Sequence, residues 1–202
     1  MVSPEVHWHQ LDMRQVSMRR FWPWLAIIIV VTAAVYQLQS QGRMWLCSCG
    51  RFQLWVGDTW SPENSQQFLD PYSFTHVLHG FLFCGLLAWM IPRLSSVWRL
   101  WLAVSFEALW EVVENTDRII ERYRGLTAAI GYQGDTILNS VGDILSFGVG
   151  FMLARHLGFG RCVALFVATE VVLLIWIRDS LILNVIMLIY PIEGIRVWQM
   201  GH

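Results

Sequence analysis

The stretch FTHVLHGFLFCGLLAWM (Phe74–Met90) carries two histidines, His76 and His79, inside a long apolar run. A helix needs about 20 such residues to cross the hydrocarbon core of a bilayer, which is about 30 Å thick. Ionisable side chains are costly within such a helix and by default indicate a functional site. A spacing of three residues places both imidazoles on one helix face. The stretch therefore predicts a membrane-spanning helix with a polar site on one face.

The composition of the whole chain is typical of a membrane protein. Of its 202 residues, 55% are hydrophobic and 14% are charged, whereas about 25% are charged in an average soluble domain. The mean hydropathy is +0.47. The formal net charge of −1 gives no basis for nucleic-acid binding. Residues 1–202 are therefore predicted to form a single integral-membrane domain.

Long apolar runs predict an all-α fold, a polytopic helical membrane bundle with five transmembrane helices. These runs cover residues 21–38, 74–91, 97–113, 137–157 and 162–177. A shorter sixth run at 180–190 predicts a re-entrant or interfacial segment, or the continuation of a broken helix. The first run has no small-residue cleavage site directly after it, so it is predicted to be an uncleaved anchor.

Arginine residues predict the orientation, because short cytoplasmic loops carry more of them than outer loops do. With the N-terminus inside, the cytoplasmic side holds seven arginines: Arg14, Arg19, Arg20, Arg93, Arg99, Arg155 and Arg161. The outer loops, residues 39–73 and 114–136, hold five: Arg43, Arg51, Arg118, Arg122 and Arg124. Residues 1–20 are thus predicted to be a cytoplasmic N-terminal segment.

Polar side chains gather at the outer ends of four predicted helices. The third run carries Glu107, Glu111 and Glu114, spaced for one helix face, and the fourth carries Asp135, Asn139 and Asp143 in the same way. The end of the fifth run adds Arg178 and Asp179. Because alternate helix ends coincide in an up-down bundle, these stripes are expected to surround one site that opens outward.

Histidine and carboxylate side chains are ligands for Zn and, with more oxygen donors, for Mn or Fe. The predicted ligands of a divalent metal are His76, His79, Glu111 and Asp143. The predicted catalytic residues are Glu107, Asp135 and Asn139, with Glu107 or Asp135 as general base because burial raises a carboxyl pKa. Arg122 and Arg178 are predicted to bind a phosphate of the substrate.

Other interpretations of the same residues stay open. The stripes suit a structural network of mutually paired polar groups, or a proton or ion relay. Asp135 suits the N-cap of the following helix, and Arg122 suits a surface ion pair with Asp117 or Glu121. Cys47 and Cys49 in the outer loop suit redox activity, metal capture or an intermolecular bond, or are two unrelated thiols.

Several strings resemble a family of small proteobacterial inner-membrane proteins that is known as a conserved domain of unknown function. They include HVLHGFLF, EALWEVVENTDRIIERYR, GYQGDTILNSVGD and IRDSLILNVIMLIYP, and the resemblance extends from about Arg43 to Gly201. It implies a multi-pass location in the bacterial inner membrane. The stretch GDTILNSVGD is also similar to part of VanZ-like membrane proteins, which are linked with envelope biology.

The first functional hypothesis is a metal-dependent membrane enzyme that acts on an envelope lipid or lipid-linked substrate from the periplasmic side. The alternative is a non-enzymatic binding or assembly subunit, or a small transporter, with a structural polar network. The expected partners are membrane lipids and, for a subunit, other membrane proteins. Whether the protein is an enzyme is left open by the sequence.

Overall fold

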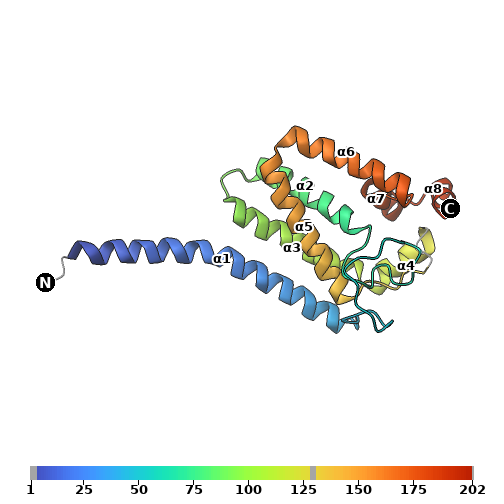
Figure 1. Ribbon diagram of the computed structural model, residues 1–202, viewed down its shortest axis with the longest axis horizontal. Helices are drawn as coiled ribbons and strands as arrows, with labels where there is room; N and C mark the ends of the chain where they lie inside the picture. The colour runs from blue at the N-terminus through green and yellow to red at the C-terminus, as the bar shows by residue number, and fades with distance from the viewer. Residues whose placement is uncertain (1–3, 128–130, 202) are drawn as a thin grey trace.

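The computed structural model describes residues 4–127 and 131–201, and for residues 4–20 and 126 it describes the backbone alone. Regular structure within these ranges is helical throughout, which confirms the predicted all-α class. The helices are α1 (Pro4–Ser40), α2 (Ser73–Met90), α3 (Ser96–Glu114), α4 (Asp117–Leu126), α5 (Ile137–Leu157), α6 (Phe159–Trp176), α7 (Leu181–Ile189) and α8 (Glu193–Met200). In Figure 1, α4, α7 and α8 gather at the end of the bundle opposite the N-terminus.

Within the described residues, four helices are long and apolar enough to cross a membrane: residues Phe21–Ser40 of α1, and the whole of α2, α5 and α6. They correspond to four of the five predicted runs. The remaining run, the third at 97–113, forms α3, which has 19 residues and a charged stripe that lowers its hydropathy. The sixth run forms α7, a separate helix of nine residues. At about 1.5 Å per residue α7 is about 14 Å long, which is too short to cross a bilayer core of about 30 Å.

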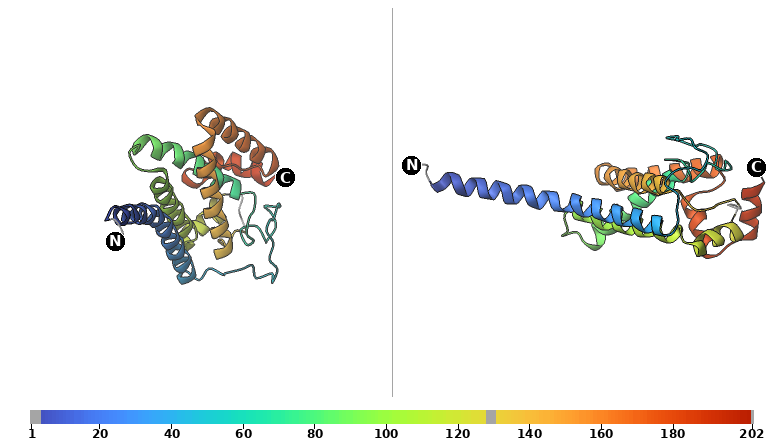
Figure 2. Two further views of the ribbon diagram at one scale, coloured as in Figure 1. Left: turned by 60° about the vertical axis from the view of Figure 1, so that its left-hand side comes forward. Right: turned by 90° about the horizontal axis from the view of Figure 1, so that it is seen from below.

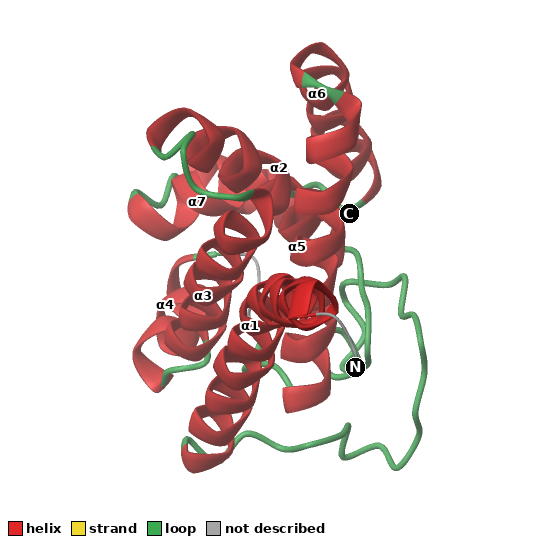
Figure 3. Ribbon diagram, turned by 90° about the vertical axis from the view of Figure 1, so that its left-hand side faces the viewer, coloured by secondary structure: helices red, strands yellow, loops and turns green. Residues whose placement is uncertain are grey.

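The helices α2 and α5 pack backbone to backbone at the centre of the molecule (Figure 3). A Cβ atom on Gly80 would meet backbone atoms of Phe147 and Phe151, and one on Gly150 would meet the carbonyl of Val77. Glycine permits this approach because it has no side chain. The contact fixes the distance between the two helices one turn away from the polar residues of each.

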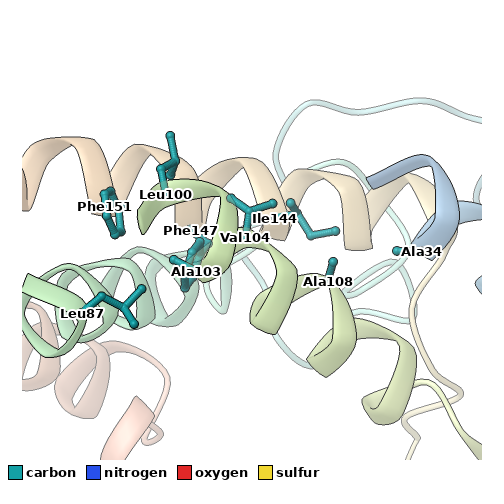
Figure 4. Packing of buried hydrophobic residues seen from close by; sticks show 9 residues of the cluster. All are labelled: Ala34, Leu87, Leu100, Ala103, Val104, Ala108, Ile144, Phe147 and Phe151. Carbon is teal, nitrogen blue, oxygen red and sulfur yellow. The ribbon is translucent and has the colours of Figure 1, made fainter. Parts of the chain in front are cut away.

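An apolar core lies beside this contact and holds α1, α2, α3 and α5 together (Figure 4). Its buried members are Ala34, Leu87, Leu100, Ala103, Val104, Ala108, Ile144, Phe147 and Phe151. A second cluster of Leu78, Phe81 and Leu181 packs α7 against α2. The bundle thereby presents the polar faces of α2, α3 and α5 to one another.

Residues 41–72 form an irregular loop at the same end as α4, α7 and α8, whereas the first half of α1 extends past the bundle at the other end (Figures 1 and 2). The loop docks on the start of α5. The Thr136 amide donates to the Ser65 carbonyl at 3.1 Å, and the Ile137 amide donates to the Met44 carbonyl at 2.8 Å. The N-terminal end of α5 is therefore covered by this loop.

Candidate metal centre

Close packing of α2 against α5 places His76 opposite Asp143, because each residue lies one helical turn from the glycine contact at Gly80 and Phe147. The third helix of the site, α3, contributes Glu107 and Glu111, which are four residues apart and so share a face. Three helices from distant parts of the chain thus bring the polar residues together. His76, Glu107, Glu111 and Asp143 are all buried.

Glu107 lies between the two imidazoles. Its Oε1 atom is 2.5 Å from Nδ1 of His76 and 3.3 Å from Nδ1 of His79. The two rings stand edge to face with their centroids 5.3 Å apart. A carboxylate accepts hydrogen bonds, so each neutral imidazole carries its proton on Nδ1 and keeps a lone pair on Nε2. Carboxylates orient metal-ligating histidines in this way in many proteins.

The Nε2 side of His76 faces Asp143, whose Oδ2 atom lies 3.8 Å away. The other oxygen of Asp143, Oδ1, accepts a hydrogen bond from Oγ of Ser73 at 2.8 Å. Ser73 therefore fixes the direction in which the carboxylate points. Ligands at about 2.1 Å from a tetrahedral Zn ion lie about 3.4 Å apart, so the separation of 3.8 Å needs only a small adjustment to hold an ion.

Glu111 is the least satisfied polar group of the site. Its residue is 0% exposed, and neither carboxylate oxygen has a hydrogen-bond partner. Its nearest cationic candidate is Nδ1 of His76, which lies 3.6 Å from Oε1 and is already paired with Glu107. An ionised carboxylate without hydrogen bonds is costly to bury. Among the described residues Glu111 therefore has no hydrogen-bond donor, and its ion pair with His76 exists only when that imidazole is protonated.

The residues form two overlapping sets that could hold a cation. Ligand atoms of His76, His79 and Glu107 lie within 4.8 Å of one another, and so do those of His76, Glu111 and Asp143. Two imidazole nitrogens with carboxylate oxygens suit Zn, Mn or Fe. His76 belongs to both sets, so the structure places three of the predicted ligands, His76, Glu111 and Asp143, together, and groups the fourth, His79, with His76 and Glu107.

Asp135 and Asn139 lie nearer the outer end, in a layer where the polar groups are paired. Asp135 accepts hydrogen bonds from Nδ2 of Asn115 at 2.8 Å and from the Tyr132 hydroxyl at 3.0 Å. Its own amide donates to Oδ1 of Asn115 at 2.6 Å. Burial raises the pKa of Asp135 to about 6, although the bonds from Asn115 and Tyr132 act in the opposite direction. Asp135 is therefore a tie between α3 and the start of α5.

Asn139 ties the outer loop to α5. Its Nδ2 atom donates to the Gln67 carbonyl at 2.9 Å and lies 3.4 Å from Oδ2 of Asp70. Thr136, and not Asp135, is the N-cap of α5, since the Thr136 side chain accepts from the Asn139 amide at 3.2 Å. The interpretation of Asp135 as that cap is wrong, because Asp135 is one residue too early and its carboxylate is occupied by α3. The catalytic role of Asp135 and Asn139 stays a prediction.

The two predicted phosphate-binding arginines, Arg122 and Arg178, donate hydrogen bonds to backbone carbonyls and not to the histidine–carboxylate cluster. Arg122 on α4 donates to the carbonyls of Leu188 at 2.5 Å and Ile189 at 3.0 Å, and so ties α4 to the end of α7. Arg178 donates to the Trp198 carbonyl at 3.1 Å, and its guanidinium lies 6.0 Å from that indole ring. Their binding of phosphate also stays a prediction.

Sequence reasoning missed three residues that complete the polar region: Asp70, Ser73 and Asn115. Ser73 precedes His76 by three residues, and Asn115 follows Glu111 by four, so the helical spacing that selected the neighbouring residues extends to both. Asp70 lies in the loop, and only the docking of that loop brings it to Asn139. Glu170, an acid within α6, accepts from the amides of Leu181 and Ile182 and thereby caps α7.

The fold and the cluster define an all-helical protein with four helices that suit a membrane and a buried histidine–carboxylate site. The chain matches the family model "Protein of unknown function (DUF2585)" over residues 38–201 and belongs to that family. This confirms the resemblance drawn from the sequence motifs.

Relatives cover nearly the whole chain. A "UPF0314 protein" of Paracoccus denitrificans is 45% identical over 181 residues, which is 90% of this chain and 94% of the relative. Relatives from Sphingopyxis alaskensis and Rhizobium meliloti are 43% and 41% identical, and each alignment covers 91% of this chain and 96% and 93% of the relative. No solved structure matches the chain. The comparisons give no support to the similarity with VanZ-like proteins.

Proposed function

We propose that the chain is a bacterial inner-membrane protein with a cytoplasmic N-terminus and five crossing helices, α1, α2, α3, α5 and α6. Arginines support this orientation, because Arg93, Arg99, Arg155 and Arg161 all lie at the helix ends opposite the cluster. The crossing of α3 is supported by its burial: its acidic residues face α2 and α5 rather than lipid. On this topology the cluster lies near the periplasmic face of the inner membrane, and α7 and α8 lie at that same face.

The cluster, on this proposal, binds one divalent cation such as Zn or Mn. The observation that carries it is the pair of unpartnered, fully buried oxygens of Glu111 beside a histidine already oriented by Glu107. A divalent cation supplies the missing positive charge and offsets the cost of burying carboxylates. His76, Glu111 and Asp143, whose ligand atoms lie within 4.8 Å of one another, would hold the ion, with His79 as a further ligand. Glu107 would hold both imidazoles through their Nδ1 protons.

The chemistry that this site suits best is hydrolysis of an envelope lipid or lipid-linked substrate. A bound divalent cation activates water as a nucleophile near neutral pH. The site lies within the bilayer's outer leaflet on the proposed topology, at the depth of lipid head groups. The His79 side chain is 21% exposed, compared with 9% for His76, so His79 marks the more open edge of the cluster. Glu107 lies within hydrogen-bond distance of both imidazoles and would keep them oriented.

The second candidate is a non-enzymatic binding or assembly subunit. It is favoured by the polar layer at the start of α5, where the hydrogen bonds are those of a structural network. Asp135 and Asn115 bond each other, and Asn139 bonds the Gln67 carbonyl. A transporter ranks lower, because it needs a polar path to the opposite face and Glu170, the acid within α6, is occupied in capping α7. This second candidate function predicts the same fold without a bound metal.

Elemental analysis of the purified protein in detergent separates the two candidates. The wild type is expected to retain close to one equivalent of Zn, Mn or Fe, and the His76→Ala/His79→Ala variant is expected to lose it. The matched control is Glu170→Gln, a buried acid in another membrane helix, which is expected to keep the metal. A metal-free wild type that regains none on dialysis against each ion would overturn the metal centre and leave the subunit. Metal loss accompanied by loss of lipid hydrolysis would support the enzyme.

A further inference from the structure

The outer loop contains a disulfide between Cys47 and Cys49, two cysteines with only Ser48 between them. A disulfide stabilises a fold mainly by closing a loop of the unfolded chain, and the effect grows with loop length. Here the closed loop is as short as a non-adjacent pair permits, and no two elements of the fold are joined. The bond therefore contributes little to holding the loop in place, and a chemical role fits it better.

The two sulfurs have different environments. Cys47 is buried, with 8% of the residue exposed, whereas Cys49 is exposed. The Cys49 amide lies 3.2 Å from Sγ of Cys47, and Nε2 of Gln67 lies 3.4 Å from Sγ of Cys49. An N–H group directed at sulfur stabilises the thiolate relative to the thiol. Each sulfur thus has its own donor, and Cys49 is the one that an incoming thiol reaches.

A carboxylate stands beside the pair. An oxygen of Glu63 lies within 4.8 Å of both sulfur atoms. Glu63 is held in place by Arg51, with which it forms an ion pair, and by Nε2 of Gln67 at 3.0 Å. At this range a proton passes between carboxylate and sulfur through one water molecule or a small rotation. Gln67, which is 1% exposed, contacts both Cys49 and Glu63 and so positions the two groups together.

We propose that Cys47 and Cys49 form a thiol–disulfide exchange site whose substrate is the dithiol of another protein. One thiol of the substrate gives its proton to Glu63 or water and attacks Sγ of Cys49 as a thiolate, the bond to Cys47 breaks, and Cys47 leaves as a thiolate that takes up that proton or one from water. The second thiolate of the substrate then attacks the substrate sulfur that is bonded to Cys49, and Cys49 is released as a thiolate that takes up a proton. The substrate loses two electrons and becomes a disulfide, and the Cys47–Cys49 pair gains them as two thiols.

The site is independent of the metal centre in its chemistry, and it rests on the proposed topology only for its periplasmic location. That location is oxidising, which suits a pair that passes through a disulfide. The loop nevertheless connects the two sites, because the side chain of Gln67 contacts Cys49 and its backbone carbonyl accepts from Asn139 on α5. Loss of the exchange reaction and loss of metal are measured separately, so either proposal fails without the other.

The test uses full-length protein in detergent with Cys84 and Cys162 replaced by alanine. Reduced Cys47→Ser and Cys49→Ser variants are mixed with oxidised glutathione, and the adduct is followed by mass spectrometry. Cys49 in the Cys47→Ser variant is expected to react about tenfold faster than Cys47 in the Cys49→Ser variant. It is also expected to react several-fold faster than a control thiol, Phe52→Cys, which stands exposed in the same loop in a chain without other cysteines. Adding Gln67→Leu to the Cys47→Ser variant is expected to remove most of that advantage.

Equal rates at Cys49, Cys47 and the Phe52→Cys thiol would overturn the proposal. A second measurement on the intact pair guards against a variant that fails to fold. Dithiothreitol is expected to reduce the Cys47–Cys49 bond while circular dichroism shows the helices unchanged. A bond that is reduced only when the protein is unfolded would mark the disulfide as structural and would also overturn the proposal.

Discussion

Replacing Gly80 with alanine tests the helix contact on which the candidate metal centre depends. The added Cβ would lie 2.5 Å from the Phe151 amide nitrogen, whereas ordinary contact begins at 3.4 Å. The obstacle is backbone, and the Phe147 carbonyl oxygen lies closer still, so no side chain can turn away and α2 and α5 must separate locally by at least about 0.9 Å. Overpacking of this kind costs about 1–3 kcal/mol, and we expect the upper part of that range because both partners are helical backbone.

The same displacement acts on the site one turn away. The 3.8 Å between Nε2 of His76 and Oδ2 of Asp143 would grow by a similar amount, whereas ligands of one ion lie about 3.4 Å apart. Gly80→Ala is therefore expected to weaken metal binding about tenfold or more. The assays are denaturant unfolding in detergent, followed by tryptophan fluorescence, and metal content after dialysis.

Gly85→Ala is the matched control, because Gly85 lies on the same helix and a Cβ there would meet nothing within 4 Å. Alanine is favoured over glycine in helices by about 1 kcal/mol, so this variant is expected to be as stable as the wild type or more so. If Gly80→Ala matches Gly85→Ala in both stability and metal content, the close contact of α2 with α5 is not what positions His76 and Asp143, and the reasoning fails.

Three further predictions concern buried carboxylates. Glu111→Met is expected to raise the free energy of unfolding of the metal-free protein by about 1–3 kcal/mol, because it removes two unsatisfied oxygens, and to lower metal content; a loss of stability instead would show that His76 pairs with Glu111. The pKa of Asp135 is raised to about 6 from 3.8, so its protonated form stabilises the folded state below about pH 4. This contribution, about 3 kcal/mol at most, is lost as pH rises through 6. The Asp135→Asn variant is expected to lack this dependence of the unfolding free energy on pH, and an unchanged dependence would contradict the assignment. Glu170→Ala is expected to destabilise the protein by about 1–2 kcal/mol, as a lost helix cap does, with metal content unchanged; metal loss would place Glu170 in the site.

Helix positions were predictable because hydropathy and length are local properties of the chain. The run 137–157 coincides with α5, and the run 74–91 differs from α2 by one residue at each end. The meeting of His76 with Glu107 and Asp143 also followed from the sequence, since polar stripes at alternate helix ends of an up-down bundle coincide in space. These inferences needed no knowledge of which side chains touch.

The roles within the polar region depended on contacts that the sequence does not encode locally. Asn139 binds Gln67 and lies near Asp70 because residues 41–72 fold back over the start of α5, and spacing along one helix does not reveal this docking. Arg122 lies against the carbonyls that end α7, a partner that follows from the packing of α4 on α7. Helical spacing thus identified the polar residues that lie together, but it did not show which belong to the histidine–carboxylate cluster and which tie the helices and the loop to one another.

The difference in hydrogen bonding between the two halves of the polar region is the strongest physical argument for a ligand. A structural network in a membrane protein is expected to satisfy all its buried groups, because each unpaired one is costly. The outer half meets this expectation: Asp135, Asn115 and Asn139 each have defined donors or acceptors. In the inner half, Glu111 has none, and Glu107 is shared by two imidazoles. Donors are thus missing at Glu111, which lies beside His76 and Asp143, and this is where a cation would lie. A hydrogen-bond network confined to these side chains would leave both oxygens of Glu111 without a donor. The missing donors therefore favour a bound ion over a purely structural role.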